Sequence, residues 1–164
     1  ELQGQFDKIV SVGMFEHVGK KFYKSFFDSV NRLLKPDGNF LLHTISTIEK
    51  PGPGNEFIGR YIFPGGVVPS FSELIKPIEN AKLIVSDCET LIRHYDKTLE
   101  CWLDRFQEKA EIVKSLYDEK FYRMWEFYLA SCSAAFRFRD LCVVQLSIVK
   151  NFKSAPQTRD YIYS

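Results

Sequence analysis

The sequence has 164 residues, of which 45% are hydrophobic and 15% are aromatic, and its formal net charge is +1. This length suits one domain that can bury a core, and the hydrophobic content excludes a disordered chain. A net charge so close to zero predicts no nucleic-acid partner.

The four cysteines predict neither a metal site nor a disulfide framework. They form no C-x-x-C pair and have no histidine at zinc-site spacing, so they are typical of a reducing compartment. No apolar run reaches the roughly 20 residues that cross a bilayer. These features favour a cytoplasmic protein, and they leave contact with a membrane surface open.

The first third of the chain predicts a strand, a helix and a second strand. Residues 6–13 are a short apolar run, as in a buried strand, and from 20 to 34 apolar residues recur every three or four positions, as in an amphipathic helix. "KPDG" at 35–38 predicts a turn, and 39–46 predicts the next strand. A helical crossover predicts that the two strands are parallel.

The middle of the chain predicts a loop and a short helix. Residues 47–57 contain two prolines and two glycines, which favour a loop. Ser70 or Ser72 is a candidate N-cap for a helix that runs through Ile75 and is cut by Pro77.

The last half predicts two strands around two long helices. Residues 81–89 are the third strand, and Asp96 is the expected N-cap of a helix that runs to about residue 116. A second helix covers about 118–139, and 141–150 is the final strand. The predicted fold class is therefore α/β.

Polar residues follow both strands of the first unit. Glu16 comes just after the first strand, and His43 lies near the end of the second. Because ligands of open α/β sheets bind beyond the carboxyl ends of the strands, we expect these side chains to converge on one ligand. The alternatives are a solvated or helix-capping role for Glu16 and an ordinary strand-end histidine at position 43.

Five segments in this order resemble the C-terminal part of cyclopropane-fatty-acyl-phospholipid synthases. They are "FDKIVSVGMFEHVG", "LKPDGNFLLHTI", "YIFPGG", "YDKTLECWLDRF" and "FYRMWEFYLASCSAAFRFRD", and the resemblance covers about residues 6–150. It implies a class I S-adenosylmethionine-dependent methyltransferase fold, with a mostly parallel sheet. The strand at 141–150 would be the last, antiparallel one, between 39–46 and 81–89. The resemblance also implies that the first half, with the Gly-rich loop that holds most of the cofactor, is absent. Residues 1–152 would then be the C-terminal part of the domain, and 153–164 a loose tail.

The family's activity is the transfer of a methylene from S-adenosylmethionine to a cis double bond of a phospholipid acyl chain. The reaction passes through a carbocation, which bound bicarbonate deprotonates. Carried over residue by residue, the resemblance implies that Glu16, His43, the amide of Ile45 and Tyr95 hold the bicarbonate, with Glu16, His43 and Tyr95 as catalytic residues. The alternative for Tyr95 is simple packing at the start of its helix.

The resemblance also implies lipid contacts and partners. The candidates for lipid contact are Tyr61, Phe63, Arg137 and Arg139, although the two arginines could equally pair with acids. The expected partners are phospholipid acyl chains at the inner face of the membrane and the N-terminal half of the same fold. An exposed strand at 6–13 would make the isolated chain poorly soluble or a homodimer. Two alternatives stay open, a lipid methyltransferase that makes branched chains and a non-catalytic remnant of the fold.

Overall fold

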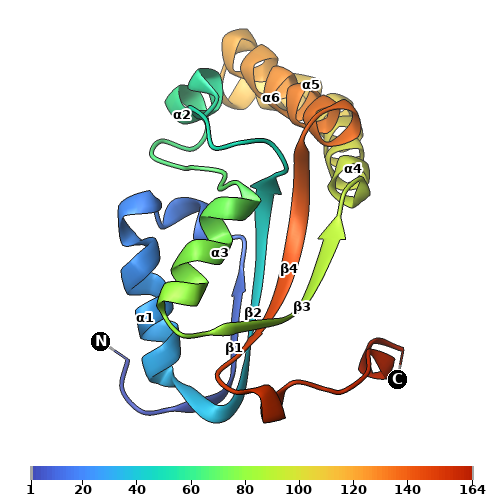
Figure 1. Ribbon diagram of the computed structural model, residues 1–164. Helices are drawn as coiled ribbons and strands as arrows, with labels where there is room; N and C mark the ends of the chain where they lie inside the picture. Colours follow the sequence, from blue (N-terminus) through green and yellow to red (C-terminus); the bar gives the residue numbers. More distant parts are fainter. Residues whose placement is uncertain (1, 164) are drawn as a thin grey trace.

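The computed structural model describes residues 2–163, and in that range four strands form one sheet in the order β1-β2-β4-β3 (Figure 1). The strands are β1 (Phe6–Val12), β2 (Leu34–Thr47), β3 (Ile84–Leu91) and β4 (Leu141–Val149). β1 pairs parallel with β2, whereas β4 pairs antiparallel with both β2 and β3. β1, β2 and β3 therefore share one direction, and the antiparallel last strand lies between β2 and β3 as predicted.

The connection from β1 to β2 confirms the predicted crossover, with α1 (Tyr23–Leu33) as its helix. The predicted turn at 35–38 lies within β2 instead. The pairing of β2 with β1 is irregular there, and its register shifts between Phe6 and Lys8 of β1. A Cβ atom at Gly38 would lie 2.9 Å from the backbone oxygen of Asp7. The close approach of these two backbones therefore requires glycine.

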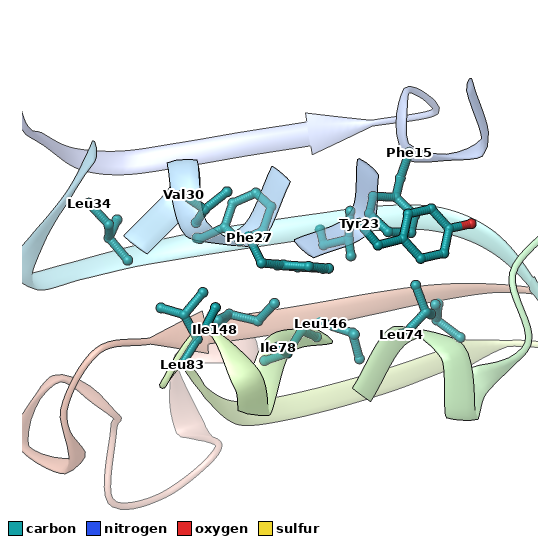
Figure 2. Packing of buried hydrophobic residues seen from close by; sticks show 14 of the residues in the cluster. Phe15, Tyr23, Phe27, Val30, Leu34, Leu74, Ile78, Leu83, Leu146 and Ile148 are labelled. Carbon is teal, nitrogen blue, oxygen red and sulfur yellow. The ribbon is translucent and has the colours of Figure 1, made fainter. Parts of the chain in front are cut away.

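The larger core lies between the sheet and the two helices α1 and α3 (Phe71–Asn80), as Figure 2 shows. Phe27 of α1, Leu74 of α3 and Phe40 and Leu42 of β2 are completely buried there. Alternate residues of a strand point to one face of the sheet, which explains why Phe40 and Leu42 share this core. Burying each such side chain contributes about 1.5–3 kcal/mol.

The helix α3 is longer than predicted. Ser70 begins it with a capping box that involves Glu73, but Pro77 lies inside the helix and does not end it. Leu74 and Ile78, on either side of this proline, are both fully buried. Their packing offsets the backbone hydrogen bond that proline cannot make.

The third strand begins later than predicted. Ala81 is the C-cap of α3, and Lys82 has a positive φ of 56°, so the chain is still turning where the strand was expected to start.

A second layer of helices lies at the end of the sheet toward which β1, β2 and β3 point (Figure 1). It contains α2 (Glu56–Tyr61), α4 (His94–Glu108), α5 (Ala110–Leu116) and α6 (Glu119–Phe138). The sequence did not predict α2, which Asn55 caps at its N-terminus. The single helix expected from Asp96 to residue 116 is divided at Lys109, and Asp96 lies inside the first turn of α4 rather than capping it.

The tail beyond Val149 contains two short 3-10 turns, at Phe152–Ser154 and Asp160–Ile162. Arg159 forms an ion pair with Asp87 of β3 at 2.7 Å, and Ser154 donates a hydrogen bond to the carbonyl of Pro36 in β2 at 3.2 Å, so the tail contacts the sheet. The expectation that residues 153–164 are loose stays a prediction. Within residues 2–163, no helix has the length and apolar character needed to span a membrane.

Candidate active site

Glu16 lies where the ladder between β1 and β2 ends. The last backbone bond is donated by Gly13 to the carbonyl of His43, at 3.0 Å. The chain then turns through a 3-10 helix, Phe15–His17, which the fully buried ring of Phe15 anchors in the core. One ladder step further along β2, the amide of Ile45 donates to Oε1 of Glu16 at 2.7 Å. The carboxylate thus replaces a backbone acceptor beyond the end of β1.

The second carboxylate oxygen of Glu16 has no such role. Glu16 is only 9% exposed, and its Oε2 is buried without a hydrogen-bond partner among residues 2–163. A buried polar atom without a partner costs free energy, so it calls for a donor from outside the chain. Capping the strand accounts for Oε1 alone.

Tyr95, in the first turn of α4, lies close to this carboxylate. Burial raises the pKa of its phenol, and the negative charge of Glu16 and the thiol of Cys132 raise it further. A raised pKa keeps the hydroxyl protonated and able to donate. Its ring packs against Phe136, with 5.0 Å between ring centroids, and against Trp102, with 6.1 Å.

His43 is half-buried on β2, paired with Val12 of β1 and Gln145 of β4. It shares a sheet face with Ile45, because residues two apart in a strand point the same way and lie about 7 Å apart. Its ring has no hydrogen bond or ion pair with any residue from 2 to 163. The structure therefore brings together Glu16, the amide of Ile45 and Tyr95, with His43 on the neighbouring ladder position.

A buried ionic network holds Tyr95 in place. The adjacent Asp96 is 2% exposed and accepts a hydrogen bond from Ser133 of α6 at 2.7 Å. Arg137 donates to both of its oxygens, at 2.8 and 3.1 Å, and also contacts Glu100. The guanidinium holds the pKa of the Asp96 carboxyl below its usual range, and Ser133 adds to this effect. The network links α4 to α6. The sequence did not predict this link, because Asp96 was expected to be a helix N-cap.

The predicted lipid contacts divide into two groups. Arg137 pairs with acids, which was the alternative interpretation, whereas Arg139 is exposed and forms no ion pair in the described part of the chain. Tyr61 is 54% exposed and its ring packs on Phe57. Phe63 lies near the candidate active site, with its ring 5.5 Å from that of His17, the neighbour of Glu16.

Phe63 also lines a cavity of about 500 Å³ between α4 and α6. The α6 wall consists of Trp125, Tyr128 and Leu129, and the ring of Phe63 lies 6.1 Å from that of Tyr128. The sequence predicted a helix over about 118–139 that contains Trp125, Tyr128 and Leu129, and it predicted no cavity there. Their spacing of three and four residues was the available signal for a shared face, and it did not reveal that the face is hollow.

Comparisons with known proteins identify the family of this chain. The family model "Mycolic acid cyclopropane synthetase" matches residues 1–146. The "Cyclopropane-fatty-acyl-phospholipid synthase" of Escherichia coli (strain K12) is 42% identical over 146 residues, which are 89% of this chain and 38% of that protein. A "Probable fatty acid methyltransferase" of Pseudomonas putida is 35% identical over 98% of this chain and 43% of its own length. The chain therefore spans less than half the length of these two relatives.

Among solved structures, the mycolic acid cyclopropane synthase CmaA1 complexed with SAH and CTAB has a TM-score of 0.82 and 32% identity. The match covers 90% of this chain and 56% of that one. Several methyltransferases of low identity share the fold, among them a coclaurine N-methyltransferase at 20% identity with a TM-score of 0.72. The chain belongs to the mycolic acid cyclopropane synthetase family and has the corresponding part of the class I methyltransferase fold.

Proposed function

We propose that this chain carries the base-holding part of a cyclopropane-fatty-acyl-phospholipid synthase, which transfers a methylene to the cis double bond of a phospholipid acyl chain. The observation that carries the proposal is the buried carboxylate of Glu16. One of its oxygens accepts from the amide of Ile45, the other has no partner among residues 2–163, and Tyr95 lies nearby.

The reaction explains why these residue types are needed. When bound, S-adenosylmethionine supplies an electrophilic methyl group and bicarbonate supplies a base. The electron pair of the double bond would form the new bond to this methyl carbon while the bond from that carbon to the cofactor sulfur breaks. S-adenosylhomocysteine would be the leaving group, and a carbocation would be left on the acyl chain. Loss of a proton from the new methyl group closes the ring. Water must be excluded from the cation meanwhile, and aromatic walls both shield and stabilise it.

The residues of this chain would hold the base and its proton. Oε2 of Glu16 accepts from the bicarbonate hydroxyl, because a bare carboxylate would repel the anion. The protonated phenol of Tyr95 and the imidazole of His43 donate to its oxygens. Since the amide of Ile45 already donates to Oε1 of Glu16, a bicarbonate at this amide shares the donor or displaces that bond.

The expected partners follow from the family and from β1. This strand is at the edge of the sheet, and Val10 and Val12 are 63% and 61% exposed. An apolar edge strand is stabilised when a further strand pairs with it. The N-terminal half of the same fold or a second copy of this chain would supply that strand. The proposed location is the inner face of the membrane, where Arg139 and Tyr61 are exposed for contact with lipid.

The test is the fatty-acid profile of a bacterial host that lacks its own cyclopropane synthase. One culture expresses this chain, and another expresses the E. coli relative with residues 1–146 of this chain in place of the matching segment. Gas chromatography and mass spectrometry should detect cyclopropane acids from the chimera. A soluble chimera that leaves the lipids unchanged would contradict the proposal and favour a non-catalytic remnant.

A second candidate is a methyltransferase that leaves a branched acyl chain. It is favoured by the 35% identity to a P. putida protein named as a probable fatty acid methyltransferase. Both candidates share the carbocation, so the same profile separates them. Methyl-branched acids in place of cyclopropane acids would identify this second activity.

A further inference from the structure

The wall of the α4–α6 cavity that α4 contributes has an unusual composition. It consists of Trp102, Arg105 and Phe106 of α4 and of Lys109, the residue that follows α4, and these are spaced by three, four and seven residues from the first. Trp102, Arg105 and Lys109 are exposed, and Phe106 is half-buried. Here two of the four positions carry cations beside two aromatic rings. The cavity volume of about 500 Å³ is in the usual range for a small-molecule site.

Neither cation has an ionic partner among residues 2–163. Arg105 and Lys109 form no ion pair and no cation–π contact in the described part of the chain, residues 2–163. Glu126 of α6 is occupied by hydrogen bonds from Gln107 and Tyr122. Like charges four residues apart on a helix repel each other. Their position near the C-terminus of α4 favours a positive charge, but it does not explain why both cations line the cavity.

The cavity adjoins the candidate active site through contacts between aromatic rings. The ring of Trp102 packs against that of Tyr95 at 6.1 Å, and Phe63 contacts His17, the neighbour of Glu16. Tyr95 and Tyr128 also belong to the same hydrophobic cluster. An acyl chain bound along the aromatic walls would therefore lie next to the candidate active site, with the cations beside the same walls.

We propose that this cavity binds an anionic phospholipid, with an acyl chain along the aromatic walls and the headgroup phosphate paired with Arg105 and Lys109. The inference rests on the proposed lipid substrate and adds a preference among lipids. A guanidinium and an ammonium are the side chains that pair with phosphate, and their aliphatic stems cover apolar surface. A lipid with a net negative headgroup is therefore bound more tightly than a zwitterionic one.

Binding can be measured at this cavity alone, because Trp102 and Trp125 are the only two tryptophans of the chain and both line it. Tryptophan emission of this chain would be titrated with monomeric dihexanoylphosphatidylglycerol, dihexanoylphosphatidylcholine and, as a chain-free anion, glycerol 3-phosphate. The anionic lipid should bind about five- to tenfold more tightly than the zwitterionic one, and added salt should reduce the difference. Glycerol 3-phosphate should leave the emission unchanged.

The double variant Arg105→Gln/Lys109→Gln should lose this preference and still bind phosphatidylcholine. The matched control Arg93→Gln/Lys76→Gln removes the same charge from exposed positions outside the cavity and should keep the preference. Equal affinity for the two lipids, binding of neither, a preference that survives in the double variant, or tight binding of glycerol 3-phosphate would each overturn the proposal. Because no turnover is measured, these outcomes are separate from a failure of the proposed enzymatic activity.

Discussion

The two helical layers of this molecule follow different rules. Between the sheet and the helices α1 and α3, Phe27, Phe40 and Leu74 are completely buried in one hydrophobic cluster. In the α4–α6 layer, aromatic rings such as Trp102 are 40% exposed, Asp96 is buried as a charge, and a cavity remains open. The first layer has the composition that stabilises a fold. The second layer departs from this composition in ways that are typical of a functional site. The candidate catalytic residues lie in this layer or next to it.

Removing a large side chain from each layer tests this difference in packing. Phe27→Ala should lower the free energy of unfolding by about 3–5 kcal/mol, because it leaves a cavity in a closed core. Phe138→Ala on α6, where the ring is 77% exposed, should change it by less than about 0.5 kcal/mol. Urea denaturation of both variants checks this. Equal losses would contradict the distinction between the layers.

The next test concerns the phenol beside Glu16. Tyr95→Phe in the chimera with the E. coli relative should reduce the modified fatty acids by about tenfold or more, because it removes a donor to the proposed base. Tyr122→Phe, which removes a hydroxyl bonded to Glu126, is the matched control and should keep the product. Fatty-acid profiles at equal protein levels give the result. Full activity of Tyr95→Phe would assign Tyr95 to packing alone.

Loss of a hydrogen bond between α4 and α6 should have a smaller effect on stability. Ser133→Ala removes the 2.7 Å hydrogen bond to Asp96 and should cost about 1–2 kcal/mol, since bonds to charged acceptors are the stronger ones. Ser131→Ala removes only a bond to the carbonyl of Tyr128 within the same helix, so it should cost much less. Thermal unfolding of the two variants distinguishes them. Equal costs would show that the network contributes little.

The smallest effect is a dependence on pH. The carboxyl of Asp96 has a lowered pKa in the folded chain, chiefly because Arg137 donates to it, so its contribution is present above the pKa of the unfolded chain, near 3.8. That contribution is lost as the pH falls through the lower, folded value. Unfolding free energies measured from about pH 5 downward should therefore fall less steeply for Asp96→Asn than for the unchanged chain. An identical slope would contradict the assignment.

The sequence predicts the elements that a local pattern encodes, and it misses features that depend on contacts between elements. Apolar periodicity identifies α1 and α6, and the family resemblance places β4 between β2 and β3, because each is encoded by local pattern or by a shared fold. The division at Lys109 and the position of Asp96 depend on contacts between α4 and α6 that no local pattern contains. The cavity is a property of two helices together. Glu16 was identified, but its bond to Ile45 depends on where β1 ends.

The central claim is that the buried carboxylate of Glu16 serves chemistry and not only the end of a strand. Glu16→Gln keeps an oxygen acceptor for the amide of Ile45 and replaces the charge, so it separates the two roles. The decisive measurement is the amount of modified fatty acid per folded protein from the Glu16→Gln chimera. The account predicts a loss of about 100-fold or more, with the free energy of unfolding unchanged or raised. A Glu16→Gln chimera that keeps its product would contradict it.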